Sequence, residues 1–209
     1  MSPVKIKVCG LTQKEQALEI ASMGVDALGF ILYPPSPRYI EPERIKPILE
    51  ALPPLVKTVG VFVDEAVEEV VRISQQTGLD LVQLHGKETP AYCRELTRQG
   101  VSWIKAFRVK EELDQELLAA YQCPSFLLDA WSKQGYGGTG ETFNWDLAKP
   151  AVEKFQILLA GGITPENVQA AIHQIQPYGI DLSSGVELSP GIKSMPKIRQ
   201  LLSNIAALS

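Results

Sequence analysis

Two residues with chemically active side chains lie directly after short apolar segments of the sequence. Cys9 ends the segment KIKVC and precedes a glycine, where a thiol is either an inert buried group or a reacting one. Asp129 follows the apolar residues FLL, where partial burial favours the protonated carboxyl that a general acid needs. Such a pair could exchange protons with a substrate. A buried structural cysteine and an aspartate that caps a turn are the ordinary alternatives.

Two glycine-containing segments in the last third of the chain are suited to binding phosphate. In LLAGGITPENV and IDLSSGVE, glycines follow apolar residues, so backbone N–H groups could approach an anion with no Cβ in the way. Gly161, Gly162 and Gly185 supply the open backbone, and Ser183 and Ser184 supply hydroxyl groups. One such loop is equally well explained by a tight turn, but two together favour a phosphate site.

Arg38 is a candidate anchor for a carboxylate. It lies in the proline-stiffened segment PPSPRYI, and a planar guanidinium there could form two parallel hydrogen bonds to a carboxylate. Most arginines are solvated surface residues, so the position alone does not decide between these roles.

The segment GYGGTG, residues 135–140, has the spacing of a dinucleotide-binding motif but not its context. It neither follows a strand directly nor opens a helix, and the chain also lacks the Walker pattern. We expect this segment to be a mobile lid over the site.

The elements that must position these residues alternate between strand and helix patterns along the whole chain. The expected strands are Val4–Val8, Ala27–Leu32, Val56–Val63, Leu79–Leu84, Trp103–Phe107, Ser125–Asp129, Gln156–Ala160 and Ile180–Ser183. The expected helices are Lys14–Met23, Pro42–Ala51, Glu65–Thr77, Pro90–Gln99, Glu111–Tyr121, Trp145–Lys149, Pro165–Ile175 and Met195–Ala206, with Thr164 capping the seventh and Pro165 in its first position.

Eight strand–helix pairs predict an α/β protein with a (β/α)8 barrel, in one catalytic domain over residues 1–209. A doubly wound open sheet is the structural alternative. In a barrel the chemistry lies at the carboxyl ends of the strands, and the candidate acids, bases and anion binders all fall in that position.

Composition restricts the class of partner. The 209 residues are 45% hydrophobic, enough for a full core, and the net charge of −4 gives no electrostatic footprint for nucleic acid. We expect no membrane partner and a cytoplasmic location, because no Lys/Arg run, long apolar stretch or signal-peptide pattern is present. The three cysteines and two histidines lack the spacing of a disulfide framework or a metal site.

Ten segments resemble, in the same order, those of the phosphoribosylanthranilate isomerase family of tryptophan biosynthesis. They are KVCGLT, DALGFIL, SPRYI, VGVFVD, VQLHG, LLDA, GGTGETFNW, LAGGITPENV, IDLSSGVE and PGIKS. The resemblance implies a (β/α)8 barrel that converts N-(5'-phosphoribosyl)anthranilate to 1-(2-carboxyphenylamino)-1-deoxyribulose 5-phosphate by an Amadori rearrangement. It also implies that no cofactor or metal is needed.

The resemblance also implies roles for individual residues. Cys9 matches the family's general base, Asp129 its general acid and Arg38 its anchor for the anthranilate carboxylate. The matches to the phosphate site are Gly161, Gly162, Ser183, Ser184 and Gly185, and Asp181 is expected as a further polar contact. His85 lies on the functional rim without an assigned role, while His173, Cys93 and Cys123 are expected to be structural. The expected partner is a small phosphorylated substrate, bound by a monomer or a homodimer.

Two other functions are weighed against this one. The related aldose–ketose isomerase of histidine biosynthesis would carry an aspartate in place of Cys9 and would need a second phosphate site. A non-catalytic phosphate-binding barrel would need neither Cys9 nor Asp129.

Overall fold

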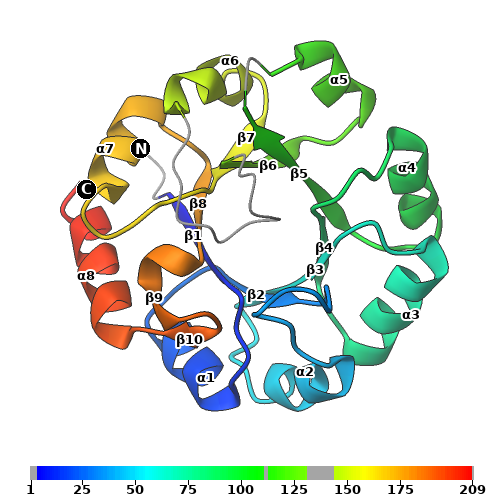
Figure 1. The fold of residues 1–209 in the computed structure, drawn as a ribbon, viewed down its shortest axis with the longest axis horizontal. Coiled ribbons are helices and arrows are strands. Elements are labelled where there is room, and N and C mark those ends of the chain that lie inside the picture. Colours follow the sequence, from blue (N-terminus) through cyan, green and yellow to red (C-terminus); the bar gives the residue numbers. More distant parts are fainter. Residues whose placement is uncertain (1–3, 111–112, 131–143, 209) are drawn as a thin grey trace.

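Eight parallel strands close into a barrel at the centre of the molecule (Figure 1). The structure is a computed structural model that describes residues 4–110, 113–130 and 144–208. The ring closes because β8 pairs with β1 in parallel, with Lys7 opposite Asp181. The predicted barrel is therefore confirmed, and the open-sheet alternative is wrong. The strands are β1 (Lys5–Cys9), β2 (Ala27–Ile31), β3 (Lys57–Phe62), β4 (Leu81–Leu84), β5 (Trp103–Val109), β6 (Ser125–Ala130), β7 (Gln156–Leu159) and β8 (Gly179–Leu182).

Helices surround the barrel in chain order, and each strand of the barrel is followed by a helical segment (Figure 1). Most lie within a few residues of their predicted bounds. They are α1 (Lys14–Ser22), α2 (Pro42–Leu49), α3 (Val67–Thr77), α4 (Pro90–Arg98), α5 (Gln115–Ala120), the 3-10 helix η1 (Trp145–Ala148) continuing into α6 (Lys149–Val152), α7 (Val168–Ile175) and α8 (Met195–Ala206). No helix of the described residues is long and apolar enough to cross a membrane.

Alternation of side chains along the strands produces two apolar layers. In β6, Phe126 and Leu128 pack outward in the core beneath the helices, whereas Leu127 packs inside the barrel with Ala106 and Ala160. Because successive strand residues point to opposite faces, Asp129 lies on the inner face with Leu127. The same alternation in β1 buries Ile6 and Val8 outside and leaves Lys7 and Cys9 on the inside.

The start of α7 differs from the sequence prediction. Asn167 Oδ1 accepts a hydrogen bond from the Thr164 N–H at 2.8 Å, and the Asn167 amide donates to the Gly162 carbonyl at 2.8 Å. These bonds make residues 165–167 a turn tied to the preceding glycine loop. The helix therefore begins at Val168, and the prediction of Thr164 as cap with Pro165 first in the helix is wrong.

The start of α5 also differs, since the helix was expected from Glu111. Asp114 caps it by accepting hydrogen bonds from the N–H groups of Glu116 and Leu117, so the helix begins at Gln115. Residues 111–112, and the predicted lid at residues 135–140, lie outside the described residues.

A short hairpin after β8 was not predicted from the sequence. The short 3-10 helix η2 (Ser184–Val186) leads into β9 (Glu187–Ser189), which pairs antiparallel with β10 (Ile192–Lys193). The hairpin lies between α8 and α1 in Figure 1, and Thr12 Oγ1 donates to the Gly191 carbonyl at 2.9 Å. It therefore joins the last strand of the barrel to the loop after the first.

Candidate active site

Cys9 and Asp129 both lie inside the barrel at the carboxyl ends of their strands. Their residues are 4% and 5% exposed, so both side chains are shielded from bulk water. The Cys9 sulfur lies against β2, where a methyl group added to Gly29 would be 2.6 Å from Sγ. Asp129 Oδ1 accepts a hydrogen bond from the Ala130 N–H at 2.9 Å. The sequence prediction that the two groups share one end of the barrel fits these positions.

Charged side chains surround the Cys9 thiol. Lys7 Nζ forms an ion pair with Asp181 Oδ1 at 2.8 Å, and both side chains are at least nine-tenths buried. Burial raises the pKa of the Cys9 thiol above its ordinary value, and Asp181 adds to this effect, while Lys7 and Lys193 oppose it. Burial likewise raises the pKa of Asp181, although the Lys7 ammonium acts against that change. Cys9 therefore belongs to a buried electrostatic cluster.

His85 lies beside Asp129. Its Nε2 lies 3.4 Å from Asp129 Oδ2, and its Nδ1 lies 3.2 Å from Gln83 Nε2. With the Gln83 amide nitrogen toward Nδ1, the neutral imidazole carries its proton on Nε2, facing the carboxyl. With the amide turned, Nδ1 would donate to Gln83 and Nε2 would be the acceptor nitrogen of the ring. The orientation of Gln83 thus sets which His85 ring nitrogen carries the proton and which one faces Asp129 without it.

A second buried network holds the loop that carries His85. Lys105 Nζ lies 3.1 Å from Glu88 Oε2 and donates to the Gly86 carbonyl at 2.8 Å. Glu88 Oε1 in turn accepts hydrogen bonds from the N–H groups of Asp64 and Gly86. Beside it lies a cavity of about 240 Å³, lined by residues that include His85, Lys105 and Arg108. This network fixes the segment between β4 and α4.

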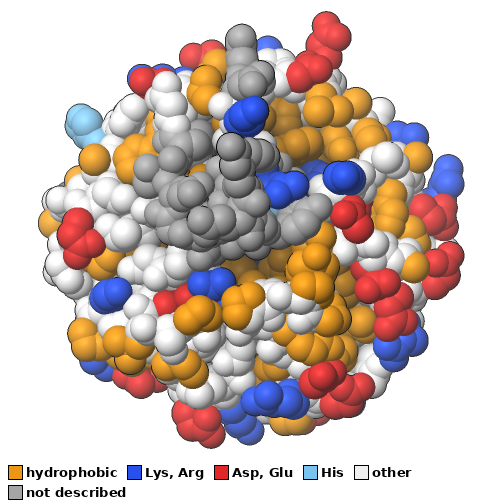
Figure 2. Space-filling model, viewed as in Figure 1, with side chains coloured by type: hydrophobic (Ala, Val, Ile, Leu, Met, Phe, Trp, Pro, Cys, Tyr) orange, Lys and Arg blue, Asp and Glu red, His pale blue; other side chains and the backbone are white. Residues whose placement is uncertain are grey.

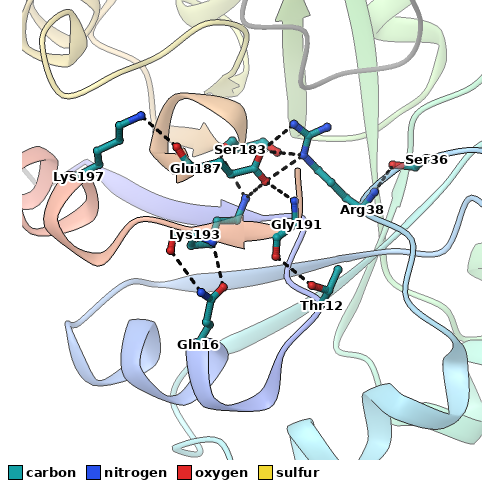
Figure 3. A network of polar contacts seen from close by, with 9 residues as sticks. All are labelled: Thr12, Gln16, Ser36, Arg38, Ser183, Glu187, Gly191, Lys193 and Lys197. Carbon is teal, nitrogen blue, oxygen red and sulfur yellow. Dashed lines mark hydrogen bonds and ion pairs between the residues drawn. The ribbon is translucent and has the colours of Figure 1, made fainter. Parts of the chain in front are cut away.

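Arg38 is buried and paired inside the protein. Its Nε donates to both carboxylate oxygens of Glu187, and its Nη2 lies 2.7 Å from Glu187 Oε2 (Figure 3). Lys193 Nζ lies 2.7 Å from Glu187 Oε1. Burial alone would raise the pKa of Glu187, but Arg38 and Lys193 bring it below its ordinary value. The two cations therefore keep the carboxylate ionised.

The two predicted phosphate loops pack against each other and against β6. A Cβ on Gly185 would overlap the Ile163 carbonyl oxygen, and one on Gly161 would lie 2.5 Å from the Ala130 nitrogen. Gly161 and Gly162 also have φ values of +82° and +62°, which favour glycine. Packing between loops thus accounts for the glycines, while the half-buried Ser183 and Ser184 lie beside them.

The remaining predicted site residues lie near these groups. Asp181 faces inward as expected and pairs with Lys7. Arg38 and Ser183 come together at Gly10, where an added Cβ would lie 2.8 Å from Arg38 Cδ and 3.4 Å from Ser183 Oγ. Figure 2 shows Lys and Arg side chains near the centre of the face viewed, whereas acidic side chains lie mostly toward its edge. This arrangement suits an anionic ligand.

Three buried charged residues of the site were not identified from the sequence: Lys7, Glu187 and Lys193. The position of Lys7, two residues before Cys9 on an alternating strand, was a usable signal. His173 is exposed on α7, Cys93 is fully buried in α4, and Cys123 donates to the Ser125 carbonyl at 3.1 Å. Across the described ranges, no group of three or more His, Cys, Asp or Glu residues could hold a metal ion.

Comparison with known proteins gives one consistent family. Residues 6–204 match the family model described as N-(5'phosphoribosyl)anthranilate (PRA) isomerase. An enzyme of that name from Pelobacter propionicus is 46% identical over 95% of this chain and 94% of its own length.

Three solved structures share the fold. Phosphoribosyl anthranilate isomerase from Thermus thermophilus has 40% identity and a TM-score of 0.91, covering 99% of this chain and all of its own. A phosphoribosyl anthranilate isomerase in complex with reduced 1-(o-carboxyphenylamino)-1-deoxyribulose 5-phosphate has 38% identity and a TM-score of 0.87, covering 98% and 99%. Monomers generated from the dimeric enzyme of Thermotoga maritima give the same four values.

Proposed function

The chain belongs to the N-(5'-phosphoribosyl)anthranilate isomerase family, and on that basis we propose that Cys9 and Asp129 are the base and acid of its reaction. The protein is an aldose–ketose isomerase of tryptophan biosynthesis. It converts N-(5'-phosphoribosyl)anthranilate to 1-(2-carboxyphenylamino)-1-deoxyribulose 5-phosphate. The observation that carries the residue assignment is the burial of both groups on the inner face of one barrel, at the carboxyl ends of β1 and β6.

The proposed steps conserve protons. Asp129 gives its proton to the furanose ring oxygen, the bond from C1' to that oxygen breaks, and a Schiff base forms. Cys9 as a thiolate then removes the C2' proton, which leaves an enolamine that tautomerises to the aminoketone product. Asp129 ends the step deprotonated and Cys9 protonated, so both must exchange a proton before the next turnover.

Arg38 and the two glycine loops are the proposed anchors of the substrate. The Arg38 guanidinium would hold the anthranilate carboxylate, its plane fixed by Glu187. Gly161, Gly162 and Ser183–Gly185 would hold the phosphate. Asp181, which faces the inside of the barrel, would make a further polar contact with the sugar. The supporting observation is that Arg38 and Ser183 converge on Gly10, next to the proposed base.

A direct assay tests the assignment of the reaction. Purified protein should consume fluorescent phosphoribosylanthranilate with no added metal or cofactor. A folded sample that leaves the fluorescence unchanged would contradict the proposal. Turnover of the substrate of the aldose–ketose isomerase of histidine biosynthesis, measured in parallel, should be far lower. The reason is that the histidine enzyme would carry an aspartate at the position of Cys9.

We also propose that the enzyme assembles as a homodimer through the amino-terminal end of the barrel. Leu55, after two prolines, is 92% exposed at the edge of a cavity of about 450 Å³ whose walls include Val59, Leu81 and Trp103. The supporting comparison is the dimeric relative from Thermotoga maritima. Sedimentation of the wild type and of Leu55→Lys should show a dimer and a monomer, and a monomeric wild type would contradict the proposal. Location in the cytoplasm and a single catalytic domain stay predictions.

A further inference from the structure

The Cys9 thiol has charged neighbours on three elements. Among the described residues these are Lys7 on β1, Asp181 on β8 and Lys193 on β10, while Gly29 on β2 places only backbone beside the sulfur. A base must lose its proton before it can accept one, and burial disfavours the thiolate. The question is which neighbour stabilises the charged form.

Lys7 has its charge balanced locally. Its ammonium is paired with Asp181 at 2.8 Å, and the Asp181 carboxylate acts on Cys9 in the opposite direction to Lys7. Asp181 therefore offsets part of the effect of Lys7 on the pKa of the thiol, although Lys7, through its charge and a side-chain hydrogen bond, is the larger influence of the two. Removing Lys7 would also leave a buried carboxylate without its partner.

Lys193 is in a different position. Its side chain is fully buried, and its counter-ion Glu187 is shared with Arg38, so that carboxylate is not devoted to Lys193 (Figure 3). Burial lowers the pKa of Lys193, whereas Glu187 and Cys9 raise it. Lys193 in turn lowers the pKa of the thiol, because its positive charge favours the thiolate.

The backbone of Lys193 is clamped in place. Its N–H donates to Gln16 Oε1 at 2.9 Å, and Gln16 Nε2 donates back to the Lys193 carbonyl at 3.3 Å (Figure 3). The ammonium group also donates to the Ser183 carbonyl at 3.4 Å. These bonds connect α1, β10 and the end of β8, so the cation is held beside the loop that follows Cys9.

We propose that the Lys193 ammonium group stabilises the thiolate form of Cys9 and that Lys193 is a positioning residue for the reaction. The inference rests on the proposed role of Cys9 as the base. Lys193 does not contact the reacting atoms in this mechanism; it acts through the sulfur.

The test is a pH titration of Cys9 thiolate absorbance, taken as the difference between each protein and its Cys9→Ser counterpart. Lys193→Met should move the midpoint upward by about one unit or more, the size expected for loss of a neighbouring cation. Lys193→Arg, which keeps a permanent charge, should stay near the wild type. The acid limb of kcat/KM should move with the thiolate midpoint, which a purely structural defect would not cause.

Lys197→Met is the matched control. Lys197 Nζ donates to the Glu187 backbone carbonyl at 3.0 Å, so this variant removes a lysine from the same network without touching Cys9 (Figure 3). An unmoved midpoint in folded Lys193→Met, or an equal shift in Lys197→Met, would overturn the proposal. Lys193→Gln serves as a second neutral variant.

Should both neutral variants fail to fold, the reciprocal titration decides. Coupling between two titrating groups acts equally on each, so Cys9→Ala should lower the pKa of the Lys193 ammonium, followed by nitrogen NMR. An unchanged Lys193 titration would overturn the proposal. Isomerase activity of Cys9→Ala separates the two hypotheses: a wild-type rate would reject Cys9 as the base and leave the thiolate titration standing.

Discussion

Arg38 and Glu187, 149 positions apart in the chain, form a buried ion pair in which Nη2 lies 2.7 Å from Oε2. The edge of the planar guanidinium of Arg38 faces the edge of the planar carboxylate of Glu187. The guanidinium can therefore neither rotate nor withdraw without breaking charge-assisted hydrogen bonds. The pair therefore presents Arg38 in one orientation at the site.

Arg38→Lys should impair binding more than chemistry. A lysine keeps the charge but loses the planar fork, so we expect KM to rise about tenfold or more while kcat changes less. Steady-state kinetics with phosphoribosylanthranilate measure both values. An unchanged KM would contradict the anchor role.

Glu187→Gln should alter the acid stability of the protein. Arg38 and Lys193 hold the pKa of Glu187 below its ordinary value of 4.5, so its ionisation stabilises the folded state above that pH. This contribution is lost as the pH falls below about 4.5 and through the lower folded-state pKa. Urea unfolding should give a steeper loss of stability on acidification for the wild type than for the variant. Equal pH slopes would show that the pair adds no such dependence.

Cys9→Ala and Asp129→Asn should each lower turnover by about two to four orders of magnitude. Each change removes a proton-transfer group and leaves Arg38 and the phosphate loops in place. The reduced form of 1-(2-carboxyphenylamino)-1-deoxyribulose 5-phosphate should therefore still bind. Cys123→Ala, a cysteine on the outer side of the barrel, is the control and should keep the wild-type rate. A wild-type rate in either site variant would remove that residue from the mechanism.

Gly29→Ala should damage the site through the sulfur of Cys9. The added methyl would lie 2.6 Å from Sγ, and the cost of such overpacking is about 1–3 kcal/mol. The same change should cost less in a Cys9→Ala background, because the sulfur is gone. Thermal unfolding of the wild type, the two single variants and the double variant measures the coupling between the two positions. Strictly additive losses of stability would place the sulfur elsewhere.

Lys105→Met should destabilise the protein far more than Lys57→Met. Lys105 pairs with Glu88 in the interior, where loss of one partner costs about 3–5 kcal/mol. Lys57 pairs with Asp80 at 3.3 Å, but its side chain is 71% exposed, and such pairs contribute about 0–1 kcal/mol. Urea unfolding compares the two, and similar losses would argue against a structural role for the buried pair.

Sequence patterns were sufficient for the strands of the barrel, for most of the helices and for the residues on the rim of the barrel. The strand patterns placed Cys9 and Asp129 at the carboxyl ends of their strands, where both lie in the structure. Predicted bounds of α8 agree with the structure, since Ser194 caps the helix by accepting from the Lys197 N–H.

Long-range charge pairs were beyond sequence reasoning. Glu187 and Lys193 gain their roles from the β9–β10 hairpin, whose strands are three and two residues long, too short to show a period. The start of α7 was missed for a related reason, because Asn167 bonds to the Gly162 carbonyl instead of continuing the helix. Local propensity cannot report a partner that only the folded chain supplies.

Closure of the ring between β8 and β1 brings together proposed catalytic and binding residues that come from two distant parts of the chain. Cys9 and Arg38 come from the first quarter, whereas Asp129, the phosphate loops and Lys193 come from the second half. A fragment cut after β4 would thus hold the proposed base without its acid, and the complementary fragment the acid without its base. Neither fragment would catalyse the reaction alone. Recovery of activity on mixing would indicate that β1 and β8 had paired again and closed the barrel.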